Sequence, residues 1–241
     1  MKAHTVFSLR NVKKTWAAPD EEFKLSIPHL EIKAGQQIAV QGQSGCGKST
    51  LLDVLAMTLE PTSSEHFRFE PKKGSSADIR DAWANRRMDQ LAGLRGRNIG
   101  YVLQTGGLLP FITVRENIEL PRQLCRLPPK HTTQLLAERL KITDQLDKLP
   151  SDLSVGQRQR VAVARALSHE PTVVLADEPT ASLDPHTAAE VMDLFVELVH
   201  LQGITLLLAS HDWVRVDELG FTKLHHEQIE ENGTLRSEYY S

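Results

Sequence analysis

The sequence predicts an α/β fold whose core is a mostly parallel sheet covered by helices on both faces. Residues 173–176 and 204–209 are short, wholly apolar runs, the pattern of strands that are buried on both faces. A third apolar strand, residues 38–40, leads through a glycine-rich turn directly into a helical pattern that begins at Thr50. Because strands and helices alternate in this way, we expect parallel strands joined by helices.

The composition is that of an ordinary globular protein. The chain has 241 residues, 40% of them hydrophobic and 24% charged, with a net charge of −3. This length suits one large α/β domain with a subdomain, or two small domains. The near-neutral balance gives no electrostatic case for nucleic-acid binding, and no apolar run approaches the ~20 residues that span a bilayer. We expect no signal peptide, and two cysteines without zinc spacing suggest a reducing compartment.

The first part of the chain is expected to be rich in strands. In chain order the expected elements are strands over 5–12, 22–32, 38–40 and 67–69, a polar, Arg-rich helix over 81–94 and a strand over 99–103. Pro28 has no N–H for a ladder, so it makes the second strand an edge or interrupted strand. Gly35 marks the turn into the third strand.

The second part is expected to be mainly helical. Pro121, Pro128 and Pro129 should break the region after 103 into short pieces. A helix is expected over 131–147, and another over 161–167. The apolar face expected for the first of these consists of Leu135, Leu136, Leu140 and Ile142. Asp184 should cap a further helix that has Pro185 at its first position and Gly203 at its end.

A phosphate-binding motif joins the third strand to its helix. Residues 42–50 fit the pattern G-x-x-x-x-G-K-[ST] and consist of Gly42, Gln43, Ser44, Gly45, Cys46, Gly47, Lys48, Ser49 and Thr50. Glycines let the backbone wrap a phosphate, and the amides at the helix start point at the anion. Lys48 adds a positive charge, and the Ser49 hydroxyl suits Mg²⁺. The alternative is a Gly/Ser-rich turn between a strand and a helix. Cys46 is interpreted as a small side chain that fits the loop rather than as a redox residue.

Polar residues follow three of the expected strands. Asp177 and Glu178 come directly after the strand 173–176, and the carboxyl ends of parallel strands meet at the edge where ligands bind. Asp177 can reach Mg²⁺, and Glu178 can act as a base on a water in line with the γ-phosphate. His211 and Gln104 end two other strands and can approach the phosphate and the metal. Taken alone, the acidic pair also fits a turn, His211 a structural or solvated histidine, and Gln104 a polar residue that leaves a strand.

A second anion site is indicated at residues 153–160. Ser154 and Gln157 have the spacing of a capping box, and the helix start that they cap contains Gly156. Such a helix start binds anions. Two phosphate-binding helix starts with one catalytic apparatus suggest that two chains meet head to tail and share each nucleotide.

These motifs, in this order, resemble those of the ATP-binding subunits of ABC transporters. The likeness runs from about Phe7 to about Ile229 and includes the turn 182–184. It implies a single ABC-type ATPase domain over 1–241 with a P-loop NTPase core, an antiparallel β subdomain and an α-helical signature subdomain. The core with its β subdomain would take 1–104 and 170–241, and the helical subdomain 105–169.

The resemblance also implies a role for each matching residue. The expected ATP-binding residues are Trp16, which would stack on adenine, the loop 42–50, Gln104, and Ser154, Gly156 and Gln157 from a second copy. The expected Mg²⁺ ligands are Ser49, Gln104 and Asp177, and the expected catalytic residues are Glu178 as general base, His211, Lys48 and Gln104. Asp184 would signal between subunits.

The likeness extends to one branch of the family and has one departure. Residues 107–110 and 113–121 resemble the ATPases of lipoprotein release, macrolide efflux and cell division. The partners implied are a second copy in an ATP-sandwich homodimer and an integral membrane subunit, with no nucleic acid. The place implied is the cytoplasmic face of the membrane. Val155 stands where the family usually has glycine. It leaves open a regulatory or scaffold module with little hydrolysis, and the other alternative is a soluble, non-transport ABC ATPase.

Overall fold

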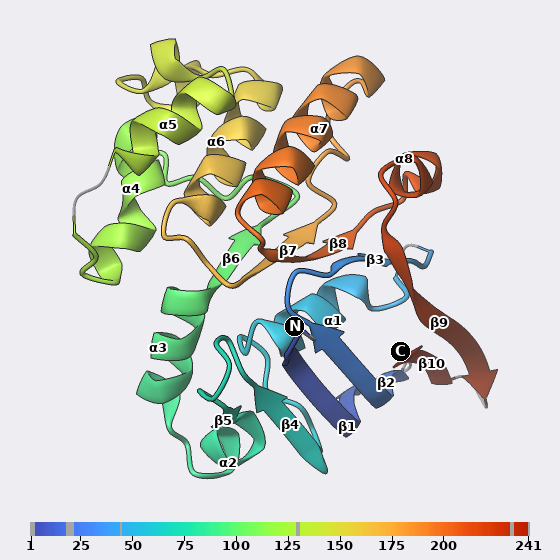
Figure 1. Cartoon of the computed structure of the whole chain (residues 1–241). Coiled ribbons are helices and arrows are strands. Elements are labelled where there is room, and N and C mark those ends of the chain that lie inside the picture. The colour runs from blue at the N-terminus through green and yellow to red at the C-terminus, as the bar shows by residue number, and fades with distance from the viewer. Residues whose placement is uncertain (1–2, 18–21, 44, 129–130, 232–233, 241) are drawn as a thin grey trace. The chain divides into compact units, whose positions relative to one another are not determined.

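The computed structural model describes residues 3–17, 22–43, 45–128, 131–231 and 234–240 (Figure 1). The chain divides into two compact units. Unit 1 consists of Met1–Arg95 and Leu207–Ser241, and unit 2 is the continuous segment Gly96–Leu206. Unit 1 is therefore built from both ends of the chain, whereas unit 2 is built from its middle. The subregions expected from the sequence stay a prediction.

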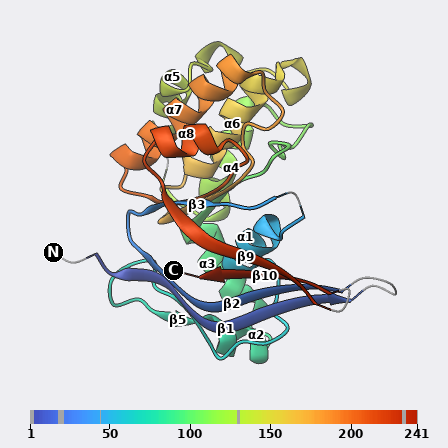
Figure 2. The same cartoon turned by 90° about the vertical axis from the view of Figure 1, so that its right-hand side faces the viewer.

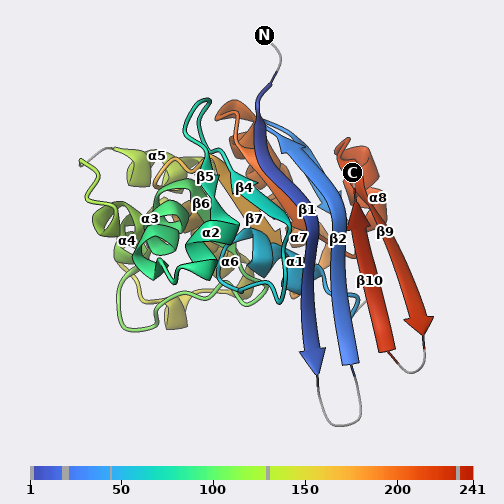
Figure 3. The ribbon, with the colours of Figure 1, turned by 90° about the horizontal axis from the view of Figure 1, so that it is seen from below.

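Unit 1 is built on a mixed sheet. Its strands are β1 (Thr5–Ala17), β2 (Glu22–Lys33), β3 (Gln37–Val40), β4 (His66–Phe69), β5 (Ala77–Asp78), β9 (Thr222–Glu231) and β10 (Thr234–Tyr240). They are ordered β5-β4-β1-β2-β10-β9-β3, and Figure 3 shows β4, β1, β2, β10 and β9 side by side. The pairs β2–β10 and β3–β9 are parallel, and the other pairs described here are antiparallel. The C-terminal hairpin thus lies between β2 and β3.

The expectation for Pro28 holds only in part. Strand β2 pairs with β1 on one side, and on the other side β10 pairs with residues 22–26. This first half of β2 is therefore central rather than an edge. Pro28 lies beyond the end of the β10 ladder, where the missing N–H leaves no ladder bond unmade on that side.

The Arg-rich helix expected over 81–94 is two helices. They are α2 (Ile79–Ala84) and α3 (Met88–Asn98), and α3 crosses the boundary between the units along the chain. The break has a local cause. The Asn85 side-chain amide donates to the backbone oxygen of Asp81 at 3.0 Å, beside the backbone bond from the Asn85 N–H to the same oxygen at 3.0 Å. Arg86 follows with φ 51°, a left-handed conformation that does not continue a right-handed helix. The remaining unit 1 helices are α1 (Lys48–Leu55) and α8 (Trp213–Glu218).

Unit 2 gathers four helices on a parallel pair of strands. The strands are β6 (Ile99–Val102) and β7 (Val173–Asp177), and the helices are α4 (Val114–Leu124), α5 (Thr132–Arg139), α6 (Val155–Leu167) and α7 (Pro185–Leu201). Helix α6 packs against α4, α5, α7 and β6, and Figure 2 shows these helices together. This central place explains why Val161–Ala164 are all fully buried. Strand β8 (Thr205–Ala209) then leads the chain back into unit 1.

Two expectations for this region were wrong. Pro121 lies inside α4 instead of breaking it, because a complete capping box starts the helix and burial of Val114 and Ile118 holds it in place. The helix expected over 131–147 ends at Arg139, and Leu135 is 55% exposed rather than part of the apolar face. Leu136, Leu140 and Ile142 are buried as expected.

The helix that follows β7 matches its expectation. Asp184 caps α7 by accepting a hydrogen bond from the Thr187 N–H at 3.0 Å, Pro185 is the first helical residue, and Gly203 follows the end with φ 64°. Among the described residues no helix has the length and apolar character needed to cross a membrane.

Candidate functional site

The phosphate loop of unit 1 has the backbone that its glycines allow. Strand β3 is buried, and the chain then turns through Gly42, Gly45 and Gly47, which have φ values of 152°, 81° and 87°. At Gly47 a side chain would also clash, because a Cβ there would lie 2.6 Å from Cζ of Phe23. At Gly42 a Cβ would lie 2.1 Å from Sγ of Cys46. Ser44 lies outside the described residues.

Lys48 and His211 meet at this loop. The Lys48 ammonium is almost buried, with 5% of the residue exposed, and its Nζ donates to the backbone oxygens of Gly42 and Gln43, each at 3.0 Å. Nζ also lies 3.4 Å from Nε2 of His211. Because an ammonium only donates, this contact requires the imidazole nitrogen to be unprotonated. The structure therefore places a positive charge and a histidine together at the loop.

The start of α1 has the geometry of an anion-binding helix start. Gly47 is its N-cap residue, and within the described residues no side chain caps it. The first N–H groups of a helix have no partner inside the helix, and groups of this kind bind phosphate oxygens in other proteins. The side chain of Ser49 is exposed at the same turn. These features fit a nucleotide phosphate with its Mg²⁺.

Trp16 lies in the same unit near the end of β1. It is 49% exposed, and the Lys14 ammonium lies 4.8 Å from the centre of its ring. A base that stacks on Trp16 would use the other face of the ring or displace Lys14. The aromatic surface needed for stacking is therefore accessible.

Unit 2 brings Gln104 and Asp177 to neighbouring strand ends. Strands β6 and β7 are parallel with Val102 opposite Ala176. Asp177 is the last residue of β7, and Gln104 is exposed in the turn closed by the Gly106 N–H on the Leu103 oxygen at 2.9 Å. The amide and the carboxylate are thus at the same end of this strand pair, as the sequence indicated.

Glu178 has a backbone conformation that nothing in the sequence signalled. Its φ is 46°, in the left-handed region, and its backbone oxygen accepts a hydrogen bond from the Ala181 N–H at 3.2 Å. A side chain with a Cβ is strained there. Strain of this kind can mark functional sites, but six further described non-glycine residues outside the candidate site also have positive φ, so the conformation by itself assigns no role to this carboxylate.

The start of α6 has the expected capping box. The Ser154 hydroxyl accepts from the Gln157 N–H at 3.2 Å, and Gln157 Oε1 accepts from the Ser154 N–H at 2.9 Å. Val155 is 43% exposed, and the complete capping box on either side of it shows an undistorted helix start. At Gly156 a Cβ would lie 2.8 Å from Cγ2 of Thr187 on α7. Glycine at this position is therefore required by helix packing, whatever it binds.

Hydrogen bonds explain the charge state of the α7 cap. The side-chain and backbone hydrogen bonds at Thr187 lower the pKa of Asp184 below its ordinary value, because N–H groups at a helix start favour the carboxylate. Asp184 thus has a structural role beside the signalling role that the resemblance implies.

The described residues contain no group of three or more His, Cys, Asp or Glu side chains that could hold a metal ion. A Mg²⁺ that arrives with a nucleotide needs no such cluster, since it takes one or two carboxylates together with phosphate oxygens and waters. The donors of each unit, Ser49 in one and Gln104 and Asp177 in the other, are of the oxygen type that Mg²⁺ prefers.

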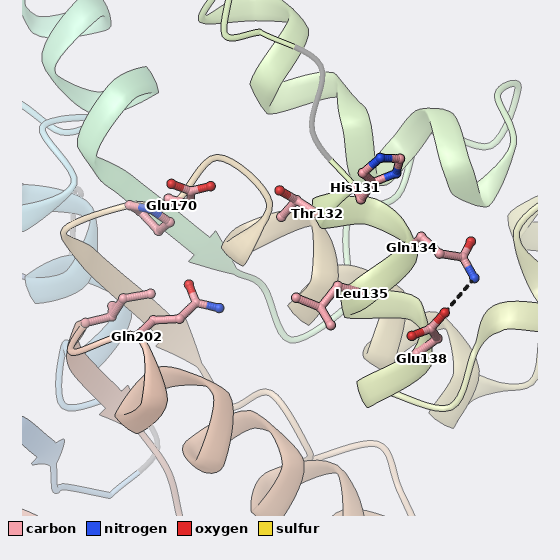
Figure 4. A pocket seen from close by; sticks show the side chains of 9 residues that line it. His131, Thr132, Gln134, Leu135, Glu138, Glu170 and Gln202 are labelled. Atoms are coloured by element: carbon pink, nitrogen blue, oxygen red, sulfur yellow. Dashed lines mark hydrogen bonds between the residues drawn. The ribbon is translucent and has the colours of Figure 1, made fainter.

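A pocket of about 830 Å³ in unit 2 involves none of these residues. Figure 4 shows it between α5, the end of α7 and the residues that precede β7 and β8. Leu135, Glu170 and Gln202 line it, and Gln134 donates to Glu138 across 3.0 Å at its rim. It lies at the amino end of β7, whereas Asp177 lies at the carboxyl end. The candidate site therefore does not include it.

The chain belongs to the ABC transporter family, since the family model described as "ABC transporter" matches residues 25–181. A macrolide export ATP-binding/permease protein, MacB of Nitrosomonas europaea, is 38% identical over 213 residues, which are 86% of this chain but only 30% of that relative. The lipoprotein-releasing system ATP-binding protein LolD of Paramagnetospirillum magneticum is 34% identical over 208 residues, 85% of this chain and 88% of the relative. The expected likeness to the lipoprotein-release and macrolide branch is confirmed.

The fold class is confirmed by solved structures of ATP-binding cassettes. One is the dimeric post-hydrolysis state of the cassette MJ0796 with ADP and Pi, which has a TM-score of 0.76 at 28% identity and covers 97% of this chain and 98% of that one. The α/β P-loop NTPase architecture expected from the motifs is therefore the observed one.

Proposed function

We propose that this chain is the ATP-binding subunit of an ABC transporter, which binds MgATP, pairs head to tail with a second copy, hydrolyses the nucleotide and drives a separate integral membrane subunit. The observation that carries the proposal is the loop at Lys48. Its ammonium is almost buried and bonded to the Gly42 and Gln43 oxygens at 3.0 Å, at the start of a helix without a side-chain cap.

Within this function each half of the site has its own task. Lys48 and the loop amides bind the phosphates, while Trp16 stacks on adenine. Ser49, Gln104 and Asp177 would hold Mg²⁺, which would supply charge neutralisation on the phosphate oxygens. Glu178 takes a proton from the attacking water as general base, and His211 contacts the γ-phosphate. Positioning and electrostatic stabilisation supply most of the rate enhancement in phosphoryl transfer.

The second copy would complete the phosphate site. Ser154 is exposed at the start of α6, where it and Gly156 can meet the phosphates bound by the partner. Val155 leaves the capping box of that helix intact, which favours an active ATPase over a scaffold with little hydrolysis. The dimeric cassette named above, similar over nearly the whole chain, supports the pairing.

The membrane subunit is proposed from the names of the relatives. One is an ATP-binding/permease protein for macrolide export, of which this chain spans 30% of the length, and another is the ATP-binding protein of a lipoprotein-releasing system. By analogy with these names, this chain would supply the ATP-binding part of such a system at the cytoplasmic face of the membrane, and a separate integral membrane subunit would supply the permease. Co-purification of a membrane protein with this chain tests the partnership, and its absence under mild detergent contradicts it.

Nucleotide binding and turnover of Lys48→Ala test the core of the proposal. Losing the ammonium should abolish MgATP turnover and weaken binding at least about tenfold, since a charge-assisted contact contributes about 1.5–3 kcal/mol. Lys72→Ala, a change at an exposed lysine, is the matched control and should behave like the unmodified chain. Unchanged nucleotide affinity and turnover in Lys48→Ala would rule out the loop as the phosphate site.

A further inference from the structure

Three adjacent strands of unit 1, β2, β10 and β9, each place one aromatic side chain next to the phosphate loop. Strand β2 contributes Phe23, whose Cζ lies 2.6 Å from where a Gly47 Cβ would be, and β9 contributes His226, whose ring lies 3.3 Å from where a Gly42 Cβ would be. Between them β10 contributes Tyr239, which is opposite His226 in the β9–β10 ladder. Figure 2 shows β2, β10 and β9 as neighbouring ribbons. The phosphate loop therefore packs against a surface that is formed by β2 and the C-terminal hairpin β9–β10.

Tyr239 makes the polar contacts of this surface. It is fully buried, and its hydroxyl donates to the backbone oxygen of Cys46 at 3.1 Å and lies 3.2 Å from Cys46 Sγ. Its ring stacks on His226 with the centroids 4.6 Å apart. Burial raises the pKa of Tyr239 far above its ordinary value, so the phenol keeps the proton that it donates. The two residues joined by this bond are 193 positions apart in the chain.

The bond to Cys46 also fixes the next amide. The Cys46 oxygen and the Gly47 N–H belong to one planar trans peptide, so they point in opposite directions. With the oxygen held against Tyr239, the Gly47 N–H is directed away from the sheet. Gly47 is the N-cap of α1 and has φ 87°, a conformation without the restraint of a Cβ. The orientation of this amide therefore depends on an anchor outside the loop.

We propose that Tyr239 is a positioning residue for the phosphate loop, and that its hydroxyl holds the Cys46–Gly47 peptide so that the Gly47 N–H faces the nucleotide phosphates. The effect that we expect from this positioning is tighter nucleotide binding, and that effect rests on the proposed function. The contacts of Cys46 agree with it, because the thiol is enclosed between the Tyr239 hydroxyl and Gly42 and leaves the peptide little room to rotate.

Tyr239→Phe and Tyr240→Phe form a matched pair for the test. Each change removes one hydroxyl from β10. The Tyr240 hydroxyl donates to Glu227 Oε1 at 2.6 Å on the exposed side and has no contact described with the loop. Calorimetric titration should show that the Tyr239→Phe variant binds MgADP about 2- to 10-fold more weakly than the unmodified chain does. A loss of affinity of this size corresponds to the loss of one hydrogen bond. Tyr240→Phe should bind like the unmodified chain.

Amide hydrogen exchange in the nucleotide-free chain separates this inference from the proposed function. The segment 42–50 should exchange faster in Tyr239→Phe than in Tyr240→Phe, while circular dichroism shows both variants folded. Equal exchange in the two variants would overturn the inference, whatever the nucleotide affinity. An unmodified chain that does not bind MgADP would overturn the proposed function, and the exchange comparison would still decide whether Tyr239 positions the loop.

One measurement needs no variant. In the unmodified chain the Tyr239 hydroxyl proton should exchange slowly enough with solvent to appear in nuclear magnetic resonance spectra, because it is buried and hydrogen-bonded. Rapid exchange of that proton would contradict the anchor even if Tyr239→Phe failed to fold.

Discussion

The strained backbone at Glu178 leads to a prediction about stability and activity together. With φ at 46°, a residue that carries a Cβ pays about 1–2 kcal/mol relative to the right-handed region. Glycine escapes that penalty but loses about 0.4–1 kcal/mol through the greater freedom of its unfolded chain. Glu178→Gly should therefore be about 1 kcal/mol more stable than Glu178→Ala, a difference of about 2–4 °C in melting temperature for a chain of this size.

Both variants should be nearly inactive. Each lacks the carboxylate that we propose as general base, and losing a base costs about 10²–10⁴-fold in rate. MgADP binding should persist, since neither change touches the phosphate loop. The assay is steady-state phosphate release together with thermal unfolding followed by calorimetry.

Glu170 provides the control for the backbone argument. Its φ is 56°, and alanine and glycine both remove its ion pair with Arg122, so that loss cancels in the comparison. Glycine should again be the more stable replacement, with turnover unchanged. If the Glu178→Gly chain melts no higher than the Glu178→Ala chain, the backbone at this position is not strained. If either variant keeps near-normal turnover, Glu178 is not the general base.

Two further predictions concern packing and pH. Gly156→Ala should destabilise the chain by about 1–3 kcal/mol because its Cβ would lie 2.8 Å from Thr187 Cγ2, and adding Thr187→Ser should restore the melting temperature; no recovery would refute the packing explanation. Burial lowers the pKa of His169 below its ordinary value of 6.5. The positive charge of Arg122 lowers this pKa further, whereas the hydrogen bond to the Ile99 oxygen raises it in part. The unfolded chain then binds the proton more readily, so stability should fall as the pH drops below about 6.5. In His169→Gln the urea midpoint should decline less between about pH 7.5 and 5.5 than in the unmodified chain, and an equal decline would exclude His169 as a cause.

Features encoded within a few residues were predictable from the sequence. The capping pairs at Ser154 and Asp184 need only local spacing, and both are confirmed in the structure. The strand before Asp177 was predictable because a run buried on both faces has only apolar residues. The phosphate loop likewise carries its glycines and Lys48 in a fixed pattern.

Features that depend on distant packing were not predictable. Pro121 is tolerated inside α4 because the helix is held by its cap and its buried face, which local propensity does not include. Leu135 has the helical spacing of a core residue, yet it faces outward on α5. The support of Cys46 by Tyr239 spans nearly the whole chain, and no spacing rule connects them. The left-handed backbone of Glu178 has no sequence signal, because glutamate rarely adopts it.

The insertion of the last hairpin between β2 and β3 has a consequence for biosynthesis. On the ribosome the phosphate loop emerges early, but β2 and β3 keep open backbone edges until residues 222–240 have been made. The continuous segment 96–206 does not need β9 or β10 for its own contacts, so we expect it to become compact before unit 1 is complete. Nascent chains stalled before β9 should therefore hold a folded middle and an incomplete nucleotide loop, with strand edges still open to pairing with other chains.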